Sequence, residues 1–565
     1  MNLSFAYLGR SALSGNALSF APNLSREPVA FDAALKHPLR FREAISALHD
    51  VVISDHRFKP RDKTAYEQWK ESEKDRVRSV RTDALKQAKA DIMAKRGVSL
   101  PADFEKQHGR LLKQYWGARQ KYAQHLQKTD MEMWRLLMPC DPVVTIADDV
   151  TFFECFSADE SSYGCLTVNR DDGFGTSENL KLGTTNVDYS WNLYHEFQSL
   201  RSYRETRFRV DPQGFDVATQ GRSDFREEKI DLPDGWLRGF MQLQSAMTLP
   251  MRKVTLTREA LYSVLVWLKK HRARTSPRAL RFERSGGALT LVLEPWETRI
   301  PVYAAPGEDW PEPIRIWGRQ RLLALARLLP LIESVDVYLL GTGFPSFWVA
   351  KMGEMRLTLG LSGWTANDWT HGSALDLLAP PSPASAAQIE SVAQHMQTVR
   401  AQSFEQITRA LNHSASTVAT ALKHLAHTGQ LIADLDAGLF RWRQIMPRAL
   451  GEAELGPDNA EFTAMRDLLM RKRAVVENTV AAPGGGFIFT GTVDTKPVEV
   501  LVDTDGRIKR GRCLCGHHQR AGIRMGPCRH LLSLRFLALN NMPAAGANDD
   551  WFARISAQAG RKGGA

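Results

Sequence analysis

Apolar residues follow two periods between residues 251 and 370. A spacing of two, typical of strands, alternates with a spacing of three and four, typical of one face of a helix. The order strand, helix, strands repeats after about sixty residues. The first copy has strands at 253–256, 280–283 and 289–293 and helical apolar positions at Leu261, Val264, Leu265 and Leu268. The second has strands at 314–316, 335–339, 347–349 and 355–359 and helical positions at Leu322, Leu325, Ala326 and Leu329. The pattern predicts one duplicated domain over residues 251–378.

This duplicated unit resembles the building block of sliding DNA clamps. The resemblance lies in the order of the elements, and an unrelated α+β domain is the alternative interpretation. Both interpretations give a mixed α/β region at these residues.

The chain before residue 251 divides into three regions by its composition. Residues 1–62 form a mixed segment of short strand-like and helical pieces. Residues 63–135 are charged and helix-forming, with apolar side chains at near-heptad spacing and a break at 97–101, which predicts a helical hairpin. This arm either binds a partner or packs on a neighbouring domain as two amphipathic helices. Residues 136–250 carry β-rich runs between turn residues, which predicts a strand-rich α+β region.

A run of Pro, Ser and Ala at 379–385 interrupts the periodic patterns and indicates a linker. Beyond it, Ser403 is a good N-cap for a second helix, and Ser414 or Ser416 can cap a third. The predicted elements are helices at 388–402 and 404–411, a third helix ending at 428–429, and strands at 431–435 and 439–443. Three helices followed by a hairpin resemble a winged helix, which we assign to residues 386–446.

Winged helices bind either DNA or other proteins, and the sequence favours neither. If this one binds DNA, its third helix enters the major groove and presents Thr420 and Lys423. Arg441 and Arg443 on the hairpin would then reach phosphates. The third helix lacks arginine, asparagine and glutamine, the usual readers of base edges, which argues against sequence-specific recognition.

Three cysteines and a histidine lie close together near the end of the sequence. Cys513, Cys515, Cys528 and His530 have the spacing C-x-C, twelve residues, C-x-H. Three thiolates and one imidazole supply four donors for a closed tetrahedral zinc site, without an open position for a reacting water. Alternation along a strand places the first two cysteines on one side, and Pro527 marks the start of a helix at the second pair. We therefore predict a structural Zn²⁺ ion.

This motif, with Gly-Pro-Cys-Arg-His-Leu at 526–531, resembles the SWIM zinc finger, and all four ligand positions are matched. We assign residues 485–542 to the finger, with His517 and His518 as rival ligands in its loop. The order of helical arm, mixed region, winged helix and finger is similar to that of large bacterial SWIM proteins. These proteins are associated with MoxR-type AAA+ ATPases and von Willebrand factor A partners, so the resemblance implies a role in an NTP-dependent bacterial system.

A formal net charge of +11 and a pI of about 9.3 suit contact with a polyanion. Basic residues gather around the predicted zinc ligands, either to bind phosphates or as a solvated face. The candidates for phosphate contact there are Arg507, Lys509, Arg510, Arg512, Arg524 and Arg529. No apolar run reaches the roughly 20 residues of a membrane helix, and no signal peptide begins the sequence, so we expect a cytoplasmic protein without membrane contact.

The sequence carries none of the catalytic motifs that we sought. The glycines at 484–486 are not followed by the Lys and Ser/Thr of a P-loop, and G-x-S-x-G and H-E-x-x-H are absent. We therefore predict an α+β multidomain protein that is not an enzyme and has no catalytic residues. The favoured function is binding of DNA or another nucleic acid through the finger and the winged helix. The alternative is an adaptor that docks a MoxR-type ATPase or a von Willebrand factor A partner.

Overall fold

The structure of the 565-residue chain is a computed structural model. It describes residues 5–7, 11–14, 17–23, 26–54, 107, 110–111, 114, 125, 141–177, 179–189, 191–203, 205–210, 227–229, 234–249, 251–273, 278–303, 306–310, 313–340, 345–362, 385–445, 460–482, 486–502, 508–523 and 526–541.

The chain divides into two units, one of residues 1–55 and 139–565 and the other of residues 56–138. Only residues 107, 110, 111, 114 and 125 of the second unit are described, and all five are helical. The helical hairpin predicted for 63–135 otherwise lies outside the described residues. Within the described part of the chain, no helix is long and apolar enough to span a membrane.

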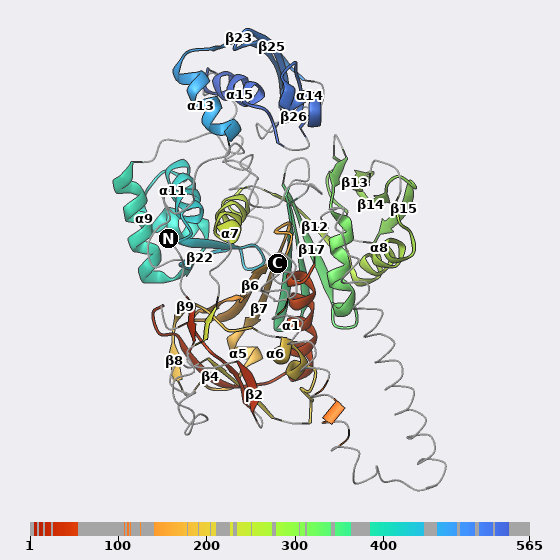
Figure 1. Ribbon diagram of the computed structural model, residues 1–565, viewed down its shortest axis with the longest axis vertical. Helices are drawn as coiled ribbons and strands as arrows, with labels where there is room; N and C mark the ends of the chain where they lie inside the picture. Colours follow the sequence, from red (N-terminus) through yellow and green to blue (C-terminus); the bar gives the residue numbers. More distant parts are fainter. Residues whose placement is uncertain are drawn as a thin grey trace. The chain divides into compact units, whose positions relative to one another are not determined.

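An eight-stranded antiparallel sheet runs through the first unit (Figure 1). Its strands in spatial order are β12 (Met251–Thr257), β17 (Ser334–Leu340), β18 (Ser346–Met352), β19 (Met355–Leu361), β7 (Ser162–Asn169), β6 (Val150–Phe156), β5 (Val143–Ile146) and β9 (Gly183–Asn186). The central strands are almost entirely buried, as expected for a sheet covered on both faces. Met355 of β19 pairs with Val168 of β7, so residues on both sides of the boundary predicted at 250/251 share one sheet.

The duplication predicted after residue 251 is visible in the order of the elements. The first copy is β12, α8 (Arg258–Lys270), β13 (Leu280–Ser285), β14 (Ala288–Leu293) and β15 (Thr298–Val302); the second is β16 (Ile314–Ile316), η1 (Arg319–Leu328) and β17 to β19. The copies exchange their first strands, because β12 pairs with β17 and β16 pairs with β13 in the sheet β15-β14-β13-β16. The helix of the second copy is a 3₁₀ helix, and its buried Leu322, Leu325 and Leu328 recur every three residues, the 3₁₀ period.

The N-terminal segment shares its core with the strand-rich region. A five-stranded sheet has the order β2 (Ala12–Ser14), β3 (Ala17–Phe20), β10 (Thr206–Val210), β4 (Ala30–Leu35) and β8 (Asn179–Lys181). The other elements of this region are β1 (Phe5–Tyr7), α1 (Pro38–Val52), α5 (Arg170–Gly173), α6 (Trp191–Phe197), β11 (Glu227–Lys229) and α7 (Asp234–Met247). The ring centroids of Phe41, Phe153 and Phe208 lie within 6.0 Å of one another and join α1, β6 and β10.

Residues 385–445 fold as three helices and a small antiparallel sheet. The elements are α9 (Ala386–Val399), β20 (Ala401–Gln402), α10 (Phe404–Leu411), α11 (Ala415–His427), β21 (Leu431–Asp434) and β22 (Leu439–Trp442), with the sheet order β20-β22-β21. Ser403 caps α10 as predicted, and Ser414, one of the two residues considered, caps α11; each hydroxyl accepts a hydrogen bond from the backbone N–H three residues later. The helices enclose a core of their own.

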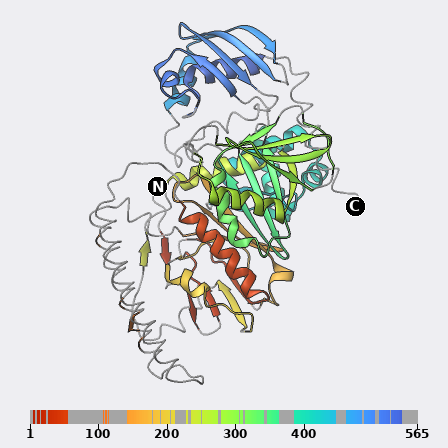
Figure 2. The same cartoon turned by 90° about the vertical axis from the view of Figure 1, so that its right-hand side faces the viewer.

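Residues 460–541 form a lobe with one sheet and three helices. The elements are α13 (Ala460–Met470), β23 (Ala474–Ala481), β24 (Phe487–Val493), β25 (Lys496–Val502), β26 (Ile508–Cys513), α14 (Gly516–Ala521) and α15 (Arg529–Asn541). The strands form an antiparallel meander, and α15 packs across all four of them (Figure 2). Leu531 of α15 lies so close to β26 that a Cβ added to Gly511 would be 2.5 Å from its Cδ2 atom. A side chain at position 511 would therefore force Leu531 or its helix to shift.

Candidate metal centre

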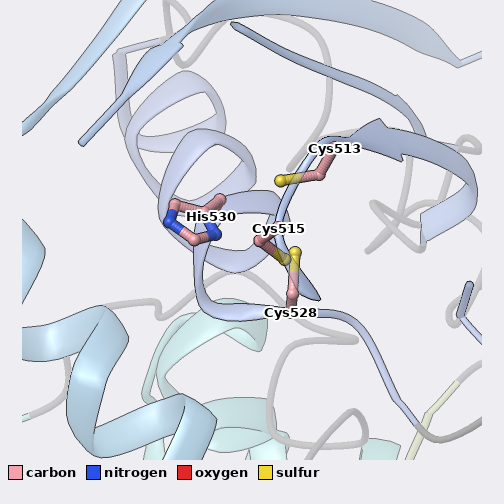
Figure 3. Close-up of side chains that lie close together, drawn as sticks. All are labelled: Cys513, Cys515, Cys528 and His530. Atoms are coloured by element: carbon pink, nitrogen blue, oxygen red, sulfur yellow. The ribbon is translucent and has the colours of Figure 1, made fainter. Parts of the chain in front are cut away.

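The four predicted ligands meet at one point of the C-terminal lobe. One donor atom from each of Cys513, Cys515, Cys528 and His530 lies within 4.8 Å of all the others, and all four residues are buried. Figure 3 shows the side chains converging between the end of β26 and the start of α15. In a tetrahedral zinc site, Zn–S bonds of about 2.3 Å place the sulfurs about 3.8 Å apart, so the cluster is compatible with one ion.

Three short elements bring the donors together. Cys513 ends β26, and Cys515 is the N-cap of α14, where its sulfur accepts a hydrogen bond from the N–H of His518 at 3.4 Å. Cys528 immediately precedes α15, and His530 lies in the first turn of that helix. The two pairs are twelve residues apart in sequence, and the sheet and helix close the gap because α15 packs on β26.

The state of the donor groups fits a bound cation. The pKa of the Cys513 thiol is lowered, chiefly by a hydrogen bond from Cys528, and that same bond raises the pKa of Cys528. Two thiols that share a proton form a site where a metal ion can replace it. The Nδ1 atom of His530 is buried without a hydrogen-bond partner among the described residues, and a cation in the cluster would give this imidazole a partner.

The rival histidines lie outside the cluster. His517 Nε2 is 3.2 Å from the carbonyl oxygen of Gly526, and His517 Nδ1 is 3.7 Å from the Glu461 carboxylate. His518 uses its backbone N–H to bond the Cys515 sulfur, but its ring is not one of the four converging groups. The sequence prediction of His530 as the fourth donor therefore agrees with the cluster.

A carboxylate from outside the motif fastens the second ligand pair. Glu461 of α13 accepts hydrogen bonds from the Arg529 backbone N–H at 2.7 Å and from its guanidinium at 2.6 and 3.1 Å. Burial alone would raise the pKa of Glu461, but the bonds from Arg529 outweigh it and the pKa is lowered. Arg529 thus anchors the start of α15 on α13. Its side chain is still 40% exposed, so the predicted phosphate contact stays a prediction.

The other predicted phosphate contacts of the lobe differ in their exposure. The side chains of Arg510 and Arg512 are 63% and 71% exposed, and each lies within 4 Å of the single carboxylate of Glu499. Lys509 belongs to β26, but its side chain is not among those described. Arg507 and Arg524 lie outside the described residues.

Arg441 and Arg443 do not lie at a free surface. Arg441 donates to Asp149 at 2.6 and 2.9 Å and to Asp434 at 3.0 Å. Arg443 donates to Glu154 at 2.6 Å, and neither side chain of this pair has any exposed surface. Both guanidiniums tie β22 to the large sheet, so phosphate contact does not fit their position.

The turn between β21 and β22 is also fixed on the large sheet. The hydroxyl of Tyr338 donates to the carbonyl oxygen of Leu435 at 2.8 Å. Lys351 pairs with Asp436 at 2.8 Å, and Arg356 pairs with Asp434 at 2.9 Å. A hairpin held along its length in this way does not project into solvent as a wing that contacts DNA would.

The predicted recognition helix, α11, is in contact with several neighbours. It packs against α7, α9, α10 and β21. Thr420 and Lys423 lie one turn apart on the partly exposed side of α11. Both side chains are half-buried, so a partner can reach only part of each.

Comparison with known proteins gives no family for this chain. No family model and no curated protein matches it. Among solved structures, Proliferating Cellular Nuclear Antigen from Entamoeba histolytica is 15% identical, with a TM-score of 0.26 over 39% of this chain and 88% of its own. The PCNA2–PCNA3 complex from Sulfolobus tokodaii is 8% identical, with a TM-score of 0.27 over 40% and 92%. Likeness at this level carries no conclusion about fold or function.

Four acidic residues matter to these sites and were not predicted. Glu461 fixes Arg529, while Asp149, Glu154 and Asp434 bind the hairpin arginines. Three of them lie far in sequence from the arginine that they pair with, and no motif or spacing links them to it. Only Asp434, a diagonal neighbour of Arg441 on the same side of the short hairpin, had a local signal in the alternation of β21 and β22.

Proposed function

We propose that residues 460–541 are a SWIM-type zinc-binding lobe that binds nucleic acid, and that the protein acts by binding and not as an enzyme. The zinc has a structural role in this proposal, because four protein donors leave no open position for a substrate or a reacting water. Bound Zn²⁺ would supply the folding energy that joins the end of β26 to the start of α15. The chain's own residues make the contacts with nucleic acid.

The distribution of charge carries this proposal. Residues 460–541 contain thirteen Lys and Arg against seven Asp and Glu, a surplus of six in a chain whose net charge is +11. Residues 386–443 contain five basic residues against four acidic ones. Since phosphate binding depends on displacing counterions with protein cations, the zinc-binding lobe is the better candidate for contact with a polyanion.

Arg510 and Arg512 are the first nucleic-acid contacts that we assign, from the basic residues around the predicted zinc ligands. They project from β26 next to the ligand Cys513, and the two share one carboxylate, Glu499, at 3.6 and 3.8 Å. Exposed ion pairs of this length contribute little to the free energy of folding, so a phosphate can replace the Glu499 carboxylate at a low cost in free energy. Zinc would fix the strand on which both guanidiniums lie.

A titration of full-length protein with DNA and with RNA at several salt concentrations tests the proposal. We expect the logarithm of the affinity to fall linearly with the logarithm of salt concentration, and Arg510→Glu with Arg512→Glu to reduce the slope by about two or more. Lys269→Glu with Lys270→Glu, on the exposed end of α8, is a control with the same change in charge. A flat salt response of the wild-type protein would exclude nucleic-acid binding by this lobe.

The adaptor function is the second candidate, and one observation favours it. Val475, Val480 and Leu514 expose half or more of their surfaces on the same lobe. Exposed apolar side chains beside charged ones suit a protein partner, such as the MoxR-type ATPase or von Willebrand factor A protein implied by the SWIM resemblance. An adaptor predicts a stable complex whose affinity persists at high salt, which the same titration series would reveal with the purified partner.

The helical module at 386–446 has a different role in this proposal. We interpret it as a winged helix that has become part of the large unit, because its hairpin arginines and its turn are used to hold it there. Thr420 and Lys423 remain predicted contacts of α11, for a protein partner or for DNA. Lys423→Gln would test the DNA contact of Lys423, because loss of one phosphate contact should reduce the salt slope by about one.

A further inference from the structure

Three segments distant in sequence meet at one end of the sheet in the C-terminal lobe. Ala474, the first residue of β23, pairs with Val493, the last residue of β24. Val493 pairs in turn with Lys496, the first residue of β25, and Val498 pairs with Cys513. The turn before β23, the turn between β24 and β25, and the Cys513–Cys515 segment therefore lie together. We call this end, which carries the first ligand pair, the zinc end of the sheet.

Basic side chains gather at the zinc end. The basic ridge consists of Arg471, Lys472, Arg473 and Lys496. Lys472 is exposed, Lys496 is half-buried, and neither has an ion-pair partner among the residues that the structure describes. Two acidic residues lie nearby: Asp467 pairs with Arg471 and Asp494 pairs with Arg473, in both cases across exposed or half-exposed side chains. The ridge keeps a surplus of positive charge.

The open face of the same sheet is a weaker site for phosphate. Arg510 and Arg512 on β26 are accompanied there by Glu499 on β25, and Glu477 on β23 accepts a hydrogen bond from Thr492 of β24. Among the side chains that the structure describes, two arginines and two glutamates leave this face without net charge. A polyanion is therefore attracted to the end of the sheet more strongly than to its face.

Backbone geometry at the ridge favours glycine, yet the sequence has other residues there. Lys472, Asp494 and Thr495 have φ angles of 54°, 48° and 66°, in the left-handed region. Lys472 follows the end of α13, a position where glycine is the usual residue. Thr495 is β-branched, which makes such a φ angle uncommon. The Asp494 N–H donates to the Arg473 carbonyl oxygen at 2.8 Å and holds the two turns together. A lysine at this strained position fits a site whose charge is needed.

We infer that the basic ridge is the main phosphate-contacting surface of the lobe, and that a nucleic-acid backbone runs across the zinc end of the sheet. This inference rests on the proposed function. It assigns Lys472 and Lys496, which no motif marks, a larger share of binding than Arg510 on the open face.

The test uses full-length protein in which Lys472→Gly is combined with Lys496→Gln. Glycine suits the backbone at 472, so this variant removes charge while relieving strain, and we expect its melting temperature to be equal or higher. The slope of log affinity against log salt for a short fluorescent DNA or RNA should fall by about two. Lys472→Asn, which tolerates the left-handed region, serves as a second variant if the first melts lower.

Lys269→Gln with Lys270→Gln on α8 is the matched control, because it removes the same charge from another exposed site. Arg510→Gln should reduce the slope of log affinity against log salt less than the loss of either ridge lysine does. The inference is wrong, and the proposed function survives, if the wild-type protein binds with a salt-dependent affinity and the ridge variant has the same slope as the wild type and the control variant. If the wild-type protein shows no salt-dependent binding, both fail.

Discussion

Two arginine pairs with the same spacing have opposite surroundings in this protein. Arg441-Trp442-Arg443 lies at the end of β22, and Arg510-Gly511-Arg512 lies near the end of β26. In each case the middle residue faces a core and the arginines point to the other side of the strand. At β22 that side meets the large sheet and its carboxylates, while at β26 it meets solvent. Strand alternation therefore predicts which way an arginine points, but not what it meets.

We expect the buried pair to contribute specificity more than stability. Burial raises the pKa of Glu154 even though Arg443 and the Tyr163 hydroxyl favour its charged form. Desolvation thus outweighs the attraction, a common result for ion pairs without solvent contact. Such a pair excludes other ways of docking β22, because any other arrangement leaves a charge buried without a partner. Arg510 and Arg512 at β26 are not desolvated in this way, so their guanidiniums stay available to a ligand.

The largest difference between the two pairs should follow removal of the metal. We expect a strong chelator, or Cys528→Ser, to unfold the lobe around β26, since zinc contributes about 10 kcal/mol or more to small zinc-dependent folds. The hairpin of β21 and β22 contains none of the four predicted zinc ligands, so it should keep its protection from hydrogen exchange. Hydrogen exchange of the two strands before and after chelation measures this, together with elemental analysis for zinc. Equal protection of β26 in both states, or undiminished zinc in Cys528→Ser, would contradict the assigned site.

Removing one partner of the buried pair should cost about 3–5 kcal/mol of unfolding free energy. Arg443→Met leaves Glu154 buried with the Tyr163 hydroxyl but without its cation, and denaturant-induced unfolding would show the loss. Adding Glu154→Leu removes the second charge and should restore part of the stability, because the Tyr163 hydroxyl then loses its acceptor. If the double variant were no more stable than the single one, packing and not charge would explain the effect.

The middle residue of the exposed pair, Gly511, lies too close to α15 to gain a side chain without a shift. Gly511→Ala should destabilise the lobe by about 1–3 kcal/mol, because the added Cβ would lie 2.5 Å from Leu531. Gly516→Ala is the matched control, since a Cβ at that position meets no atom within 4 Å. Thermal unfolding of the two variants should separate them, and equal melting temperatures would show that α15 moves away without cost.

Acid should loosen the hairpin at β21 and β22. Burial would raise the pKa of Asp434, but Arg356 and Arg441 outweigh it, so the pKa lies below its ordinary value of 3.8. A carboxyl with a lowered pKa in the folded state stabilises the fold above its unfolded pKa, and this stabilisation is lost as pH falls through the folded pKa. Hydrogen exchange of β22 below about pH 4 should rise in the wild type. In Asp434→Asn, β22 should be less protected from hydrogen exchange at neutral pH, and its protection should no longer depend on acid. If β22 of this variant responds to acid as in the wild type, a group other than Asp434 causes the response.

The exposed arginine should matter least to stability. Arg512→Ala should change the unfolding free energy by about 0.5 kcal/mol or less, because its side chain is 71% exposed and its carboxylate contact is long. The same variant should still weaken binding to nucleic acid if the proposed function holds. A large loss of stability would place Arg512 in the structure of the lobe and remove the contrast with Arg443.

The sequence predicted local features better than distant partners. The ligand set and the cap at Ser403 depend on residues close together in sequence, and each has a recognisable pattern. Asp149 and Glu154 lie nearly 300 residues from the arginines that they bind. Nothing in the alternation of apolar and polar residues identifies which carboxylate an arginine will meet. The 3₁₀ helix at Arg319–Leu328 was not distinguished from an α-helix, because leucines spaced by three fit both periods over so short a segment.

The pairing of β7 with β19 bears on how the polypeptide is made. Strand β7 leaves the ribosome long before β19, and until the later strand arrives its edge has unsatisfied N–H and C=O groups. An unpaired edge of this kind is prone to aggregate, so nascent chains that end near residue 300 should depend on chaperones. Truncations for crystallography or biochemistry should therefore keep residues 141–361 together.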